Sequence, residues 1–207
     1  MRQSLTSDES GTAMVEMAIV ASLLFIVVLG FVDFGYAFYQ WNAANKAVQV
    51  GARLASISNP VADGLQNLVD ATNLATTSNV AGDDVGPGVY KVVCDGATQS
   101  CSCTGTSCVN ISFDQTAFNL IYDGDSSRPG MHDFFPRLEK KNIQIEYVAT
   151  GLGYWTRPDG PVPTIKVSLQ SLTFQFYFLG GLLGFNDINI PSMVSSVTGE
   201  DLDSSSP

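Results

Sequence analysis

Four cysteines, Cys94, Cys101, Cys103 and Cys108, form the densest cluster of reactive side chains in this 207-residue sequence. Thiolates bind zinc or form disulfides. Zinc sites use closely paired cysteines, often with histidine, whereas the spacing here is C-x6-C-x-C-x4-C with no histidine nearby. The Gly, Ser and Thr residues around the cluster favour a disulfide-stapled loop in an oxidising compartment. We therefore predict disulfides and no metal.

The sequence does not select one disulfide connectivity. Four cysteines allow three pairings, and a bridge between Cys101 and Cys103 is the least favourable because its one-residue loop would be strained. The two connectivities that avoid this bridge remain open.

The single histidine, His132, lies beside Asp133 and is the starting point for any hydrolase triad. No G-x-S-x-G motif accompanies it, so we interpret it as a loop histidine. Asp123, Asp125 and Ser127 alternate as calcium ligands do, but the glycine and terminal glutamate of an EF-hand are out of register. The sequence thus predicts no enzyme, no catalytic residues and no cofactor.

The charge balance excludes one class of partner. Ten basic residues stand against twenty acidic ones, which gives a net charge of −10 spread along the chain. Nucleic-acid binding requires a basic surface, so none is predicted. The length suits one ordinary soluble domain together with a membrane segment.

The residues from Ala13 to Val32 read AMVEMAIVASLLFIVVLGFV, long enough to cross a hydrocarbon core of about 30 Å as a helix. A secretory signal peptide is one alternative, but the preceding MRQSLTSDESG is not basic and no small-x-small cleavage site follows. A plain signal anchor is another, and it leaves Glu16 unexplained.

A carboxylate such as that of Glu16 costs about 2.5–3.5 kcal/mol inside a membrane helix, so it usually has a partner. If the chain is cut between Gly11 and Thr12, Glu16 becomes the fifth residue, and the new α-amine of a neighbouring subunit can neutralise it. The alternative is that Glu16 lies shallow enough to reach the interface directly.

The helical pattern continues beyond the membrane to about Ser58, where Asn59-Pro60 ends it. From residue 12 this helix is about 70 Å long at 1.5 Å per residue. One face is rich in small residues, namely Ala43, Ala44, Ala47, Gly51 and Ala55. This face either packs closely against another helix or a sheet, or covers the chain's own domain.

Residues 59–207 read as an α+β domain with an antiparallel sheet. Alternating apolar residues predict strands at 143–150 and 165–170. The apolar run 172–185 is a poor second membrane span, and core or interfacial packing is favoured. The remaining predictions are strands at 89–94 and 108–113 flanking the Cys-rich loop 94–108, a last strand within 188–197, and short helices at 63–73 and 114–122, the second of them capped by Asp114.

Several of these motifs together resemble a known family. Gly11-Thr-Ala-Met-Val-Glu16 before an apolar helix looks like the class III signal of type IV prepilins. With Leu29-Gly-Phe-Val-Asp-Phe-Gly35 and Val50-Gly-Ala-Arg-Leu-Ala55, it resembles the TadE-like family, pseudopilins of the tight-adherence (Flp) pilus. Weaker similarity continues in Asp133-Phe-Phe-Pro, Tyr147-Val-Ala-Thr-Gly-Leu-Gly153 and Gly199-Glu-Asp-Leu202, and the Cys-rich insertion departs from it.

The resemblance implies a pilin-like minor pseudopilin with a leader at 1–11, a helix at 12–58 and an extracytoplasmic domain. Prepilin peptidase would cut after Gly11. Other pilins, the pilus assembly platform and the membrane would be its partners. It would sit in the bacterial inner membrane as a single-pass protein with its C-terminal domain in the periplasm, and support adhesion and biofilm formation. The rival hypothesis is an uncleaved, membrane-anchored extracytoplasmic enzyme or binding module that uses the 94–108 loop.

Overall fold

The computed structural model describes residues 9–74, 79–105, 108, 110–174, 176–184, 188–199 and 202. Most of the predicted leader lies outside these residues, as do Gln175 and Phe185 of the apolar run and part of the Gly199–Leu202 motif. The chain divides into two compact units. Unit 1 comprises Met1–Gln40 and Thr173–Asn189, and unit 2 comprises Trp41–Leu172 and Ile190–Pro207.

One helix, α1 (Glu9–Ser56), contributes to both units. It is continuous over 48 residues and ends two residues before the predicted boundary near Ser58. The long N-terminal helix followed by an α+β region confirms the predicted fold class.

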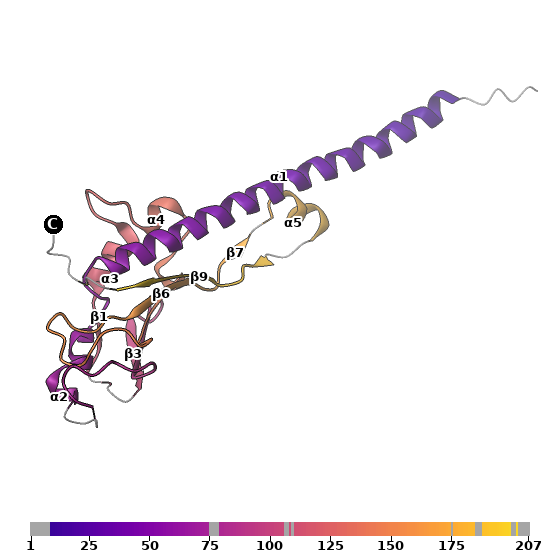
Figure 1. The fold of residues 1–207 in the computed structure, drawn as a ribbon. Helices are drawn as coiled ribbons and strands as arrows, with labels where there is room; N and C mark the ends of the chain where they lie inside the picture. The colour runs from indigo at the N-terminus through magenta and orange to yellow at the C-terminus, as the bar shows by residue number, and fades with distance from the viewer. Residues whose placement is uncertain are drawn as a thin grey trace, which may run out of the picture. The chain divides into compact units, whose positions relative to one another are not determined.

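The centre of unit 2 is a five-stranded antiparallel sheet with the strand order β3-β2-β5-β6-β9 (Figure 1). The predicted strands at 143–150 and 165–170 are confirmed as β5 and β6, which pair with each other. The five strands are β2 (Tyr90–Asp95), β3 (Ser100–Gly105), β5 (Ile143–Val148), β6 (Thr164–Leu169) and β9 (Met193–Thr198).

Alternate residues of this sheet supply the core of unit 2 because successive side chains in a strand point to opposite faces. Tyr147 is fully buried, and its hydroxyl oxygen accepts a hydrogen bond of 3.0 Å from the backbone N–H of Val61. Burial raises the pKa of this hydroxyl, which therefore stays neutral. The other buried inward residues of β2, β5 and β6 are Tyr90, Val92, Cys94, Ile143, Ile145, Ile165, Val167 and Leu169.

The small-residue face of α1 is buried inside unit 2. Ala44, Ala47 and Ala55 have no exposed surface. A β-carbon added to Gly51 would collide with the side chain of Met131, which is itself fully buried. Of the two sequence interpretations, the structure therefore supports the one in which this face covers the chain's own domain.

Short elements complete unit 2. Helix α3 (Gln115–Asp123) is capped by Asp114, as predicted. The Asp114 carboxylate accepts hydrogen bonds from the N–H groups of Thr116 (2.7 Å) and Ala117 (3.1 Å). The predicted helix at 63–73 is instead a 3₁₀ turn and a single helical turn. These elements are β1 (Ala62–Asp63), η1 (Leu65–Val69), α2 (Ala71–Leu74), β4 (Ser112–Phe113), α3 (Gln115–Asp123), α4 (Met131–Phe134) and η2 (Lys140–Asn142).

One strand was not predicted, and two predicted strands differ in extent from the observed ones. Strand β3 lies inside the segment predicted as a Cys-rich loop, and the strand predicted at 108–113 is reduced to the two residues of β4. The segment predicted as one last strand is divided between β8 (Ile188–Asn189) and β9. Residues 190–192, which include Pro191, lie between these two strands.

The opposite face of the sheet carries an ion-pair cluster. Glu146 on β5 lies 2.9 Å from the ammonium of Lys91 on β2 and 3.3 Å from that of Lys166 on β6. Partial burial by itself raises the pKa of Glu146, but hydrogen bonds and charge attraction from the two lysines outweigh it and lower the pKa overall. The cluster thus ties three adjacent strands together.

We expect Glu146→Gln to lower the free energy of unfolding at pH 7 by at most about 1 kcal/mol, because the lysines are largely solvated. The folded-state pKa is lowered, so the stabilisation is present above the unfolded-state pKa and disappears as the pH falls through the folded-state value. Urea unfolding of the detergent-solubilised chain, followed by tryptophan fluorescence, should show the two proteins converging as the pH falls below the folded-state pKa of Glu146. A difference that does not diminish with falling pH would contradict the assignment.

Candidate processing and membrane-anchoring segment

The predicted processing residues lie in the first turns of α1. Gly11, Thr12 and Glu16 are all helical and exposed. Thr12 and Glu16 are four residues apart, so they lie on the same helix face. Within the described part of the chain, no hydrogen bond or ion pair to the Glu16 carboxylate is formed. An acceptor for a positive group is therefore available close to the predicted new N-terminus.

The apolar part of α1 meets the physical requirements of a membrane span. Its most apolar 18-residue window has a mean hydropathy of 2.7, and none of that window is buried within the structure. Phe25 and Phe31 are 66% and 73% exposed, which would be unfavourable in water. The helix fits a single-pass membrane anchor.

Asp33 is the residue at this site that the sequence analysis missed. It lies just after the predicted span, yet it is only 4% exposed. Its carboxylate accepts three hydrogen bonds from consecutive backbone N–H groups of Tyr177 (3.2 Å), Phe178 (3.0 Å) and Leu179 (2.8 Å). Asp33 thereby satisfies the start of the short helix α5 (Phe178–Leu183).

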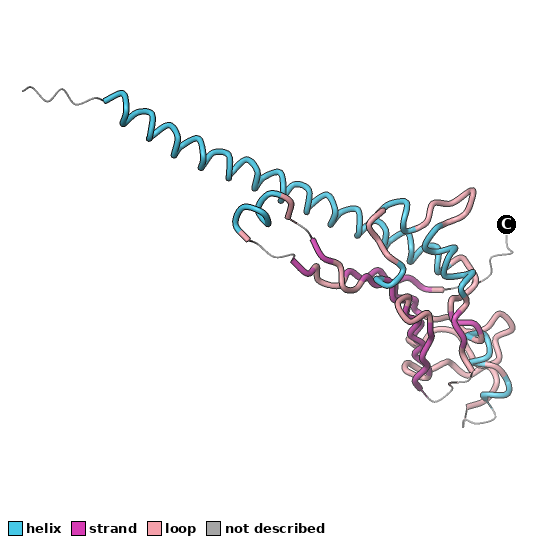
Figure 2. Tube along the Cα trace, turned by 180° about the vertical axis from the view of Figure 1, so that it is seen from behind, coloured by secondary structure: helices cyan, strands magenta, loops and turns pink. Residues whose placement is uncertain are grey.

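Helix α5 belongs to a hairpin that we define as Thr173–Asn189, in which β7 (Thr173–Phe174) pairs with β8. Both Figure 1 and Figure 2 show it alongside α1. Phe34 and Phe176 meet edge to face with ring centroids 5.7 Å apart, and Tyr36 lies 5.5 Å from the ring of Tyr177. With six residues, α5 is too short to span a membrane, in agreement with the sequence prediction.

A sequence signal for this contact did exist. Asp33 is an acidic residue bordering a long apolar segment, and the apolar run 172–185 had no assigned neighbour. The two are separated by more than 140 residues, and no local pattern pairs them.

The four cysteines form two disulfides, Cys94–Cys101 and Cys103–Cys108. This is one of the two connectivities that the sequence left open. The first bridge joins residues directly opposite each other on β2 and β3. The second joins β3 to the segment that leads into β4.

The other residues considered for chemistry have structural partners. The Asp133 carboxylate accepts a hydrogen bond of 2.9 Å from the N–H of Gly130, and the His132 ring lies 5.1 Å from that of Tyr122. Asp125 accepts hydrogen bonds from Ser127 and Arg128, which lower its pKa. In the described ranges, no group of three His, Cys, Asp or Glu side chains is placed to hold a metal ion.

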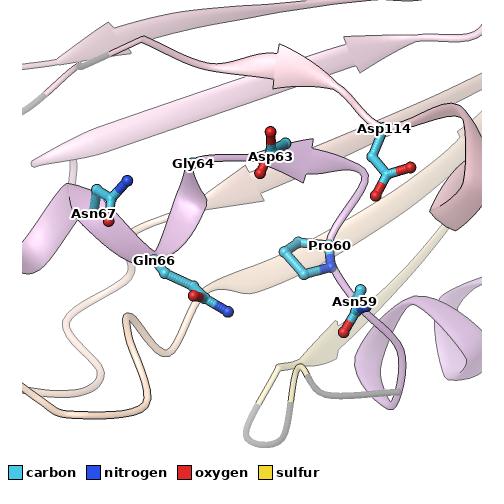
Figure 3. Close-up of a pocket in the computed structure, with 7 residues that line it drawn as sticks. All are labelled: Asn59, Pro60, Asp63, Gly64, Gln66, Asn67 and Asp114. Carbon is cyan, nitrogen blue, oxygen red and sulfur yellow. The ribbon is translucent and has the colours of Figure 1, made fainter. Parts of the chain in front are cut away.

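A polar cavity of about 240 Å³ opens in unit 2 (Figure 3). Its two carboxylates come from different elements and both have local roles. Asp63 accepts a hydrogen bond from the Ser112 hydroxyl, and Asp114 caps α3. The cavity is lined by Asn59, Pro60, Asp63, Gly64, Gln66, Asn67 and Asp114.

An apolar helix that fits a single-pass anchor is thus continued into an α+β unit. Residues 11–53 match the family model described as TadE-like protein, which confirms the resemblance over that segment. The match begins at Gly11 and supports a pilin-like role associated with the Tad pilus, in a family of pilus components. No curated protein and no solved structure matches the chain.

We expect Asp33→Ala to release the hairpin, because three N–H groups lose their acceptor at once. Hydrogen exchange of the Phe178 and Leu179 amides, measured by mass spectrometry on the detergent-solubilised chain, should accelerate about tenfold or more. Asp133→Ala, which removes the acceptor of Gly130, is the matched control and should leave hairpin exchange unchanged. Undiminished protection in Asp33→Ala would show that the carboxylate does not hold α5.

Proposed function

We propose that this protein is a minor pseudopilin of a tight-adherence (Flp) pilus, cut by prepilin peptidase between Gly11 and Thr12. The single observation that carries the proposal is the family match, which begins at Gly11 and covers the apolar helix. The protein is held in the bacterial inner membrane with its C-terminal domain in the periplasm. It acts with other pilins and the assembly platform, and thereby supports adhesion.

The exposed end of α1 supports processing. A peptidase acting at a membrane surface needs access to the scissile bond, and the residues on both sides of it are exposed. Cleavage would create a positive α-amine on Thr12. The carboxylate of Glu16 has no partner in the described part of its own chain, so the amine of a neighbouring subunit can pair with it inside the apolar bundle.

The bundle that this requires is compatible with the surface of α1. From Gly11 to Val20 every side chain is exposed, and the span is apolar except for Glu16 and Ser22. The Ser22 hydroxyl donates to the carbonyl of Ile19 (2.8 Å), so it costs little in an apolar setting. Glu16 is then the one strongly polar group that an assembly of such helices must neutralise.

Processing can be tested by intact mass of the protein extracted from native membranes. Cleavage removes 11 of 207 residues from a chain of 22.1 kDa, a loss of about 1.2 kDa. We expect Gly11→Asp to retain this mass, whereas Ser4→Asp, which adds the same charge away from the bond, should be cleaved. Glu16→Gln should be cleaved and should reduce the yield of sheared pili. A wild-type chain that still begins at Met1, or a cleaved Gly11→Asp, would refute the proposal.

The rival function, an uncleaved membrane-anchored enzyme or binding module, makes a different prediction. Its best candidate for acid–base chemistry is His132. We expect His132→Ala to leave pilus-dependent attachment intact, because the imidazole packs against the ring of Tyr122 and no catalytic motif accompanies it. The measurement is the number of cells attached to a surface. Loss of attachment in His132→Ala, with an unchanged unfolding transition, would favour the enzyme over the pseudopilin.

A further inference from the structure

The hairpin Thr173–Asn189 exposes more apolar surface than a soluble loop normally does. Tyr177, Phe178 and Ile188 are 57%, 45% and 51% exposed. The segment contains no Lys, Arg or Glu, and its sole charged residue is Asp187. Such a surface requires either a protein partner or lipid.

The position of the hairpin along α1 points to lipid. Leu179 is buried, and its side-chain carbons would be 3.8 and 3.9 Å from a β-carbon at Gly30. Gly30 is in the last turn of the predicted span, about 3 Å along the helix from Val32 at 1.5 Å per residue. Helix α5 therefore lies beside the last turn of the predicted span, which is where the hydrocarbon core would end.

Three backbone N–H groups at the start of α5 are satisfied in a way that suits an apolar setting. A helix start in apolar surroundings needs acceptors for its N–H groups. The carboxylate of Asp33 supplies them for Tyr177, Phe178 and Leu179, and the donors in turn satisfy the buried carboxylate.

Tyrosines mark the boundary on the other side of Asp33. The ring of Tyr36 lies 5.5 Å from that of Tyr177 and 6.5 Å from that of Tyr39. Tyrosine is enriched where acyl chains meet headgroups, since its ring is apolar and its hydroxyl is polar.

We propose that the described apolar part of the hairpin, residues 176–184 and Ile188, inserts into the outer boundary of the bilayer beside α1, as a second and non-spanning membrane contact that contributes to fixing the depth of the anchor. The occupant of its apolar face is the acyl-chain region of the lipid, continuous with the lipid around the span. This inference rests on α1 being a membrane anchor, as in the proposed function.

The test is quenching of tryptophan fluorescence by brominated lipid, with the full chain in vesicles of phosphatidylcholine and phosphatidylglycerol. Phe178→Trp reports the hairpin, Phe25→Trp the exposed middle of the span, and Val194→Trp an exposed position on β9 in unit 2. The emission of Trp41 and Trp155 in the parent chain is subtracted. Bromines are placed either near the headgroup or near the middle of the acyl chain, at two ratios of lipid to protein.

We expect the bromines near the headgroup to quench most of the fluorescence added by Phe178→Trp. The bromines near the middle of the acyl chain should quench most of the fluorescence added by Phe25→Trp. Val194→Trp should be unaffected, and dilution with lipid should change none of these results. In Phe178→Trp combined with Asp33→Ala, shallow quenching should weaken.

Three outcomes would overturn the inference. Quenching of Phe25→Trp without quenching of Phe178→Trp would place the hairpin in water and leave the anchor intact. Quenching of Phe178→Trp that arises only on dilution would show that a second copy of the chain covers the hairpin. Failure of Phe25→Trp itself to be quenched would remove the membrane anchor and this inference together.

Discussion

Backbone N–H groups next to an apolar helix must find acceptors, and in unit 1 one carboxylate meets that requirement. Asp33 accepts from three consecutive amides of the hairpin, and the hairpin covers Asp33 almost completely. Without the hairpin amides the buried carboxylate of Asp33 would have no partner, and without Asp33 the N–H groups at the start of α5 would have no acceptor. Either change would raise the free energy of the folded state, because a buried charge and a buried helix start both need partners. The arrangement of Leu179 against Gly30 and of the aromatic rings around Phe34 and Tyr36 depends on this one contact.

The same helix serves two environments. Toward its N-terminus α1 is apolar except at Glu16 and Ser22, and it is exposed, which suits lipid. From Ala44 to Ala55 its small residues are buried in unit 2, where Gly51 leaves room for Met131. Both stretches belong to the same continuous helix of 48 residues.

How far the sequence predicts this structure depends on whether a signal is local. The alternation at Ile143, Ile145 and Tyr147 predicts β5 because strand periodicity is read within a few residues, and the cap at Asp114 is equally local. Strand β3 was missed because Cys, Ser and Thr give no apolar alternation. The partner of Asp33 and the disulfide connectivity follow from contacts between distant segments or from strand register, which a single sequence does not contain. The roles of Gly11 and Glu16 remain predictions.

The second disulfide has a consequence for self-association. Strand β3 is the last strand on one side of the sheet, and such an edge offers unpaired backbone groups on which another chain can add a strand and begin aggregation. The Cys103–Cys108 bridge draws the segment before β4 back toward β3, and these two strands are in contact. The edge is thus guarded by the chain itself. That protection holds only while the cysteines are oxidised.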